Sequence, residues 1–149
     1  MKTTFKNIAL LFLATIALTS CTPEEQTTTA ALKNVAPENG KSFSADEVLQ
    51  PIVFRWTPVV PKPQEPPVTY RLKVWQLMQG QSSTEAMRTN QPIVTKDVDN
   101  ITQTTVSGIY TGPCRPPYLC DFVWSVEAIT MNNGSITSTV VSNPTVFNF

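Results

Sequence analysis

Apolar and polar side chains alternate along several short segments of this chain, and turn-forming residues bound each segment. The clearest apolar series are Ile52/Phe54/Trp56, Tyr70/Leu72/Val74 and Phe122/Trp124/Val126/Ala128. Successive side chains of a β-strand point to opposite faces, so this alternation predicts strands with one buried face. About seven such strands over roughly 115 residues are the size and strand count of an all-β, antiparallel sandwich.

Turn and breaker residues set the expected limits of the elements. Pro58 ends the first strand, and the proline-rich stretch Val59–Val68 predicts a stiff, extended connection. Ser82-Ser83-Thr84-Glu85 fits a capping box, which predicts a short helical insertion around Gln81–Asn90. Asn132-Asn133-Gly134 predicts a hairpin turn. The other expected strands are Pro92–Thr95 at an edge, Thr102–Ile109, Ile136–Val141 and, beyond Pro144, Val146–Phe149.

The first twenty residues read as an export signal rather than as part of the fold. Lys2 and Lys6 precede Ile8–Leu18, an apolar run too short for a spanning helix, which needs roughly 20 residues. Leu18-Thr19-Ser20-Cys21 follows at once and resembles the bacterial lipobox. The resemblance implies cleavage before Cys21 and an acylated cysteine that holds the protein on a membrane. The alternative is an ordinary signal cut near Ser20, with Cys21 as a free thiol.

The residues after Cys21 predict a tether. Thr22–Lys33 is polar, rich in threonine and free of glycine. We therefore divide the chain into a signal at 1–20, a lipidated cysteine with its tether at 21–34, and a folded domain at 35–149. Because Thr22 is not an aspartate, the sorting rule of such lipoproteins implies the outer membrane. Glu24-Glu25 resembles the acidic export signal of Bacteroidota surface lipoproteins, or forms solvated linker charges, so the periplasmic or surface face stays open.

Two further cysteines, Cys114 and Cys120, enclose Arg-Pro-Pro-Tyr-Leu. In an exported protein, cysteines this close predict a structural disulfide. Closing so short a ring contributes roughly 2–3 kcal/mol in the loop-entropy model. A redox pair usually has two intervening residues, and a zinc site needs further ligands, which a chain without histidine supplies poorly.

Several segments resemble a fibronectin type III domain, a sandwich of the immunoglobulin type. Phe54-Arg55-Trp56-Thr57-Pro58 resembles its B strand, and Tyr70-Arg71-Leu72-Lys73-Val74 its C strand. Val106-Ser107-Gly108-Ile109 resembles the end of its E strand. Phe122–Ala128 with Asn133-Gly134 resembles its F strand and F–G turn. Tyr70–Val126 is also similar to TANFOR repeat modules of Bacteroidota surface proteins. Neither family implies an active site.

The composition argues against several kinds of chemistry. The chain has no histidine, the usual general base and a common metal ligand. Removing Lys2 and Lys6 with the signal leaves nine basic and eleven acidic side chains, a net charge of about −2 that gives no reason to expect nucleic-acid binding. We expect no enzymatic activity, cofactor or metal. Asp97-Val98-Asp99-Asn100 is read as a turn before a strand, with a calcium fragment as the alternative.

Two places are candidate binding surfaces. Trp75, beside Arg71 and Lys73, is expected on the outer face of its strand, where an aromatic flanked by cations could stack on a sugar or anchor a protein. The interpretation that we favour is that the insertion Gln81–Asn90, with Met87, folds back and covers Trp75. The second place is the cysteine-bounded loop with Arg115 and Tyr118, which either binds a partner or only stiffens the loop.

These observations predict a non-enzymatic lipoprotein that is anchored to the outer membrane through Cys21 and binds a protein of the envelope or cell surface. The alternatives are a carbohydrate-binding accessory lipoprotein that uses Trp75 or Tyr118, and a structural spacer without a ligand. The expected partners are thus the membrane, a protein and possibly a glycan, and not a nucleic acid.

Overall fold

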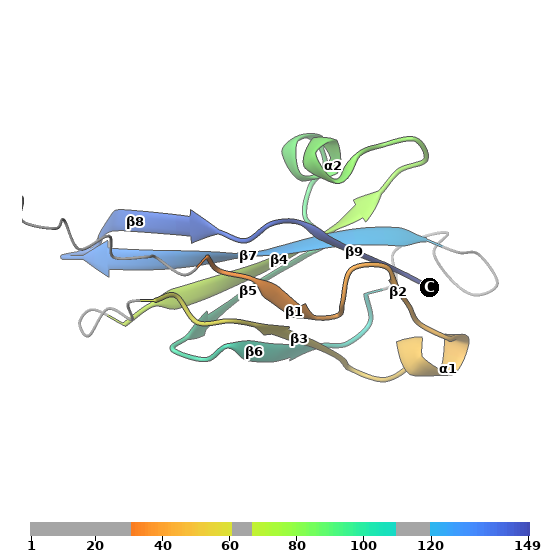
Figure 1. Ribbon diagram of the computed structural model, residues 1–149, viewed down its shortest axis with the longest axis horizontal. Helices are drawn as coiled ribbons and strands as arrows, with labels where there is room; N and C mark the ends of the chain where they lie inside the picture. Colours follow the sequence, from red (N-terminus) through yellow and green to blue (C-terminus); the bar gives the residue numbers. More distant parts are fainter. Residues whose placement is uncertain (1–30, 61–66, 110–119) are drawn as a thin grey trace, which may run out of the picture.

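The computed structural model describes residues 31–60, 67–109 and 120–149, and its strands form two sheets packed face to face (Figure 1). The smaller sheet has the order β1 (Asn34–Ala36), β3 (Ile52–Trp56), β6 (Gln103–Val106). The larger sheet has the order β2 (Lys41–Ser42), β9 (Thr145–Asn148), β7 (Asp121–Asn132), β4 (Thr69–Leu77), β5 (Val94–Asp99), and β8 (Ser135–Val141) also pairs with β7. All pairs are antiparallel except β2 with β9. The predicted all-β sandwich is confirmed, with nine strands in the described part rather than about seven.

The core lies between the inner faces of the two sheets. Every residue of the three alternating series predicted from the sequence is buried. Aromatic rings join the layers, since Phe54 of β3 meets Trp124 of β7 edge to face with their centroids 5.1 Å apart. Phe122 stacks on Phe149 at 4.7 Å near the end of the chain. The alternation thus has a direct physical cause, because each strand places every second side chain into one shared interior.

The last strand of the sandwich is broken into β8 and β9 at Pro144, as the sequence predicts. Proline has no N–H to donate, so the sheet needs other donors at the break. The Asn34 side chain of β1 supplies them: its Nδ2 lies 3.1 Å from the carbonyl oxygens of both Trp124 and Asn143 and 2.9 Å from Thr145 Oγ1. One amide from the small sheet therefore satisfies the interrupted ladder of the large one.

Two short helices flank the sheets. The predicted insertion forms α2 (Ser83–Thr89), whose N-cap Ser82 accepts a hydrogen bond from Glu85 N–H at 3.2 Å. The other helix, α1 (Ala45–Val48), was not predicted from the sequence and has a complete capping box made by Ser44 and Glu47. The Ser-x-x-Glu signal was present there, but the apolar run after it was too short to predict a helix.

Two boundaries differ from the sequence-based expectations. Leu32 is buried in the core, and the backbone of Lys33 hydrogen-bonds with Thr57, so packing begins before residue 35, within the range 21–34 that was expected to precede the folded domain. The stretch Asp97–Asp99 was expected to be a turn or a calcium fragment, but it lies within β5. The turn comes one residue later, where Asn100 has a φ of 59°. Val94 and Val98, on the same face of β5, both pack against the core, which accounts for a strand that runs as far as Asp99.

Candidate functional site

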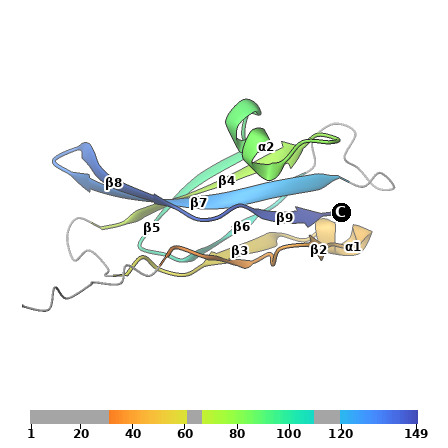
Figure 2. The same cartoon turned by 45° about the horizontal axis from the view of Figure 1, so that its top comes forward.

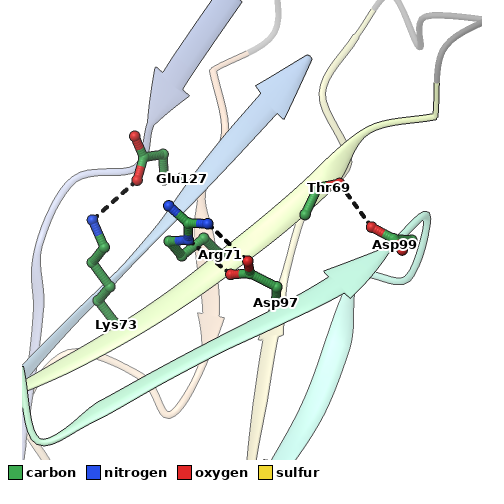
Figure 3. Close-up of polar contacts among 6 residues, drawn as sticks. All are labelled: Thr69, Arg71, Lys73, Asp97, Asp99 and Glu127. Atoms are coloured by element: carbon green, nitrogen blue, oxygen red, sulfur yellow. Dashed lines mark hydrogen bonds and ion pairs between the residues drawn. The ribbon is translucent and has the colours of Figure 1, made fainter. Parts of the chain in front are cut away.

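The outer face of the large sheet carries Arg71 and Lys73, two residues of the predicted binding surface. Arg71 donates from Nε and Nη2 to both carboxylate oxygens of Asp97, each at 2.8 Å (Figure 3). Lys73 Nζ lies 3.1 Å from Glu127 Oε2 on the opposite neighbouring strand. Strand register explains both contacts. Arg71 lies directly across from Asp97, and Lys73 lies across from Ser125, so that Glu127 is its diagonal neighbour on β7. Each cation therefore has a carboxylate of this chain, which an anionic ligand would have to displace.

The pairing of Arg71 with Asp97 also favours the charged form of both groups. The hydrogen bonds from the Arg71 guanidinium lower the pKa of Asp97, and those to Asp97 raise the pKa of Arg71. Beside them Thr69 Oγ1 donates to Asp99 Oδ1 at 2.7 Å (Figure 3). The carboxylates of β5 are thus acceptors within the sheet. In the described residues no three His, Cys, Asp or Glu side chains come together as metal ligands.

Trp75 lies on the same outer face but is covered. Its side chain is 5% exposed and packs with Ala86 of α2 and Val123 of β7 in a small second core. Leu77, Met87 and Val146 border that cluster, and α2 lies over the outer side of the large sheet (Figure 2). Of the two interpretations of Trp75, the structure has the one in which the insertion folds back. The ring has no open face for a sugar.

The other predicted functional residues fall largely outside the described ranges. Cys21, Cys114, Arg115 and Tyr118 all do so, and the disulfide and the lipid anchor remain predictions. Cys120 is described, and its N–H donates to the carbonyl oxygen of Phe149 at 2.6 Å, while the N–H of Phe149 donates back at 3.2 Å. This pairing attaches one end of the cysteine-bounded loop to the end of the chain.

A pocket of about 600 Å³ opens where α1 meets the start of β3. Its apolar lining residues are Ala36, Pro37, Phe43, Pro51, Ile52 and Val53, and its polar ones are Glu38, Lys41, Glu47 and Gln50. Lys41 lies 5.0 Å from the centroid of the Phe43 ring and 3.1 Å from Glu47 Oε1. Hydrogen bonds from the Ser44 backbone N–H and from Lys41 lower the pKa of Glu47. The pocket combines an apolar floor with a few fixed polar groups, as small ligand sites do.

This pocket was not predicted from the sequence. Its residues come from β1, β2, α1 and β3 and meet only through the fold, and no single segment has an unusual pattern. The one local signal was the unassigned capping box at Ser44, which fixes α1 against β2 through the Lys41–Glu47 pair.

With this geometry in view, the chain can be compared with known proteins. It matches no protein-family model, no curated protein and no solved structure. In the described ranges no helix has the length and apolar character needed to cross a bilayer.

Proposed function

We propose that this protein is an exported lipoprotein, held at the outer membrane through acylated Cys21, whose sandwich binds a protein partner. The observation that supports the proposal most directly is that the pocket and the point where the chain enters the domain lie at opposite ends of the sandwich. The chain enters beside Thr57, after the last residue of β3, whereas the pocket lies at the first residues of that strand. Figure 1 places α1 and the C-terminus together at that far end. A membrane tether at the entry would point the pocket away from the lipid.

The lipobox-like Leu18–Cys21 supports the anchor, and the polar residues that follow support the tether. Thr22–Ala30 is nine residues and can reach roughly 30 Å when extended. This length keeps the entry end near the membrane while leaving the domain free to turn. A partner would then meet the far end first.

Two strand pairings support the fibronectin type III-like resemblance. The segments likened to strands B and E pair as β3 with β6, and those likened to C and F pair as β4 with β7 in the other sheet. Immunoglobulin-type sandwiches divide these strands between their sheets in the same way. Domains of this architecture commonly serve in recognition, though fold alone is a weak guide to function.

A photo-crosslinking residue at Gln50, in the pocket, tests the proposal in living cells. The matched control position is Gln103, exposed on the outer face of the small sheet. We expect a discrete protein adduct from Gln50 and none from Gln103, and we expect Val53→Asp to abolish the adduct. Val53 is exposed, so a carboxylate there changes the pocket without entering the core.

Two outcomes would count against a protein partner. Absence of adducts from every pocket position would favour a spacer without a ligand. Binding on a glycan array that disappears in Tyr118→Ala would favour the carbohydrate-binding alternative, which no longer has Trp75 to support it.

A further inference from the structure

Strand β8 leaves one edge of the large sheet open. It pairs with β7 on one side, and no strand of the described ranges pairs with its other side. Ser142 N–H donates to Val126 O, so the backbone N–H of Ser142 points toward β7. Since N–H and C=O groups alternate in direction along a strand, those of Thr139 and Val141 point away from β7. Asn34 binds the Asn143 carbonyl and closes the edge just beyond this segment.

This edge lacks the usual protection against strand pairing. The chain has no charged residue from Ala128 to its end at Phe149 and no proline within β8. Natural proteins shield exposed edges with lysine, proline or a covering loop. The hairpin also exposes apolar side chains, with Ile136 at 63% and Val141 at 53%. Figure 2 shows the β7–β8 hairpin extending beyond the small sheet.

We infer that the open edge of β8 pairs with β8 of a second copy of this chain. A two-fold axis at Val140 places Thr139 of one copy opposite Val141 of the other. Both residues direct their N–H and C=O groups into the gap, so the symmetric pair forms four backbone hydrogen bonds. The uncharged strands meet without repulsion, and the edge has no charge that would select a complementary partner.

A lipid surface fits this edge less well, because unpaired backbone groups are costly in hydrocarbon. The inference rests on described strands only and does not depend on the proposed lipid anchor or on the pocket. It predicts a dimer in which the large sheets of two sandwiches become one continuous sheet.

Sedimentation of the purified full chain over a range of concentrations tests the inference, with detergent in excess where the protein is acylated. We expect a monomer–dimer equilibrium, with amide exchange at Thr139 and Val141 slowing as concentration rises. Thr139→Pro removes one donor per copy and should raise the dimer dissociation constant on the order of tenfold. Thr139→Lys should act in the same direction without disturbing the β7 pairing.

Two controls make the result specific. Thr139→Val keeps the backbone N–H and the β-propensity and should leave the equilibrium unchanged. Leu49→Lys, at an exposed apolar residue after α1, should also leave it unchanged. A chain that stays monomeric at all concentrations, or a dimer that Thr139→Lys does not weaken, would overturn the inference. So would vesicle binding by the monomer that is lost in Ile136→Lys.

Discussion

Asn34 shows how one side chain can decide whether two sheets fit together. It belongs to the small sheet, yet its amide group contacts three acceptors beside the Pro144 break in the large sheet. Ser142, two residues before Pro144, supplies a side-chain acceptor in the same region: Val126 N–H donates to Ser142 Oγ at 2.9 Å. Sequence alone predicted the break at Pro144 but not these polar groups. The partners of Asn34 lie about a hundred residues away in the chain, and Ser142 meets Val126 only through the pairing of β7 with the segment after β8.

We predict that Asn34→Ala lowers the free energy of unfolding by about 1–3 kcal/mol, because the partly buried acceptors Trp124 O and Thr145 Oγ1 lose their donor. Asn34→Asp, which has the same shape but no donor, should cost at least as much. Urea unfolding measures both, with Gln103→Ala as a control at an exposed strand position. A change below about 0.5 kcal/mol for Asn34→Ala, the range of ordinary surface substitutions, would refute this role.

The Arg71–Asp97 pair gives a prediction about pH. Because Arg71 lowers the pKa of Asp97, the pair stabilises the fold above the ordinary aspartate pKa of about 3.9, and this is lost as pH falls through the lower folded-state value. Asp97→Asn should therefore cost less than about 1 kcal/mol at pH 7, since the pair is partly exposed and screened. In unfolding curves from pH 7 to pH 2, the difference from the unsubstituted protein should vanish in acid. A difference that stays constant would contradict this origin.

At the scale of elements, α2 acts as a cover for the large sheet. It buries Ala86 against Trp75, and its start depends on the Ser82 cap. Ser82→Ala should destabilise the helix by about 1 kcal/mol. Hydrogen exchange of the α2 amides should then accelerate, together with acrylamide quenching of Trp75 fluorescence. Thr84→Ala, an exposed position inside the helix, is the control and should change neither.

The cysteine-bounded loop is the second element with a measurable role. Cys120 pairs with Phe149 at the end of the chain, so closing the ring at Cys114 should hold this corner of the sandwich. We predict that Cys114→Ser lowers the free energy of unfolding by roughly 2–3 kcal/mol. The unsubstituted protein should lose a similar amount in reductant, and the variant should lose nothing more. A variant as stable as the parent would show that the two cysteines are not joined.

The elements also show how far the sequence could lead. Alternation predicted the buried faces of β3, β4 and β7. Asn133-Gly134 predicted the hairpin turn between β7 and β8, where both residues have positive φ. Each of these signals lies within a single segment of the sequence, so it can be recognised without knowing the fold. The cover over Trp75 was the favoured prediction and is confirmed, although binding stayed the alternative because no local signal shows that α2 returns to β4. The pocket was missed because four separate elements build it.

At the scale of the whole molecule, the point where the chain enters and the pocket lie at opposite ends of the sandwich. The chain enters at one end, the pocket and the C-terminus lie at the other, and the β7–β8 hairpin extends from the entry side (Figures 1 and 2). A tether at the entry would leave the far end facing outward and place the β8 edge near the membrane. Anchoring to a membrane would raise the effective concentration of neighbouring copies, so their β8 edges would meet more often than in solution.

The mass of the mature N-terminus tests the central claim most directly. Mass spectrometry of the protein purified from envelope membranes should find a first residue at Cys21 with more than one acyl chain attached. The Cys21→Ala variant should appear outside the membrane fraction. An intact Met1 in membrane-purified protein, or a mature chain with an unmodified Cys21, would contradict the account.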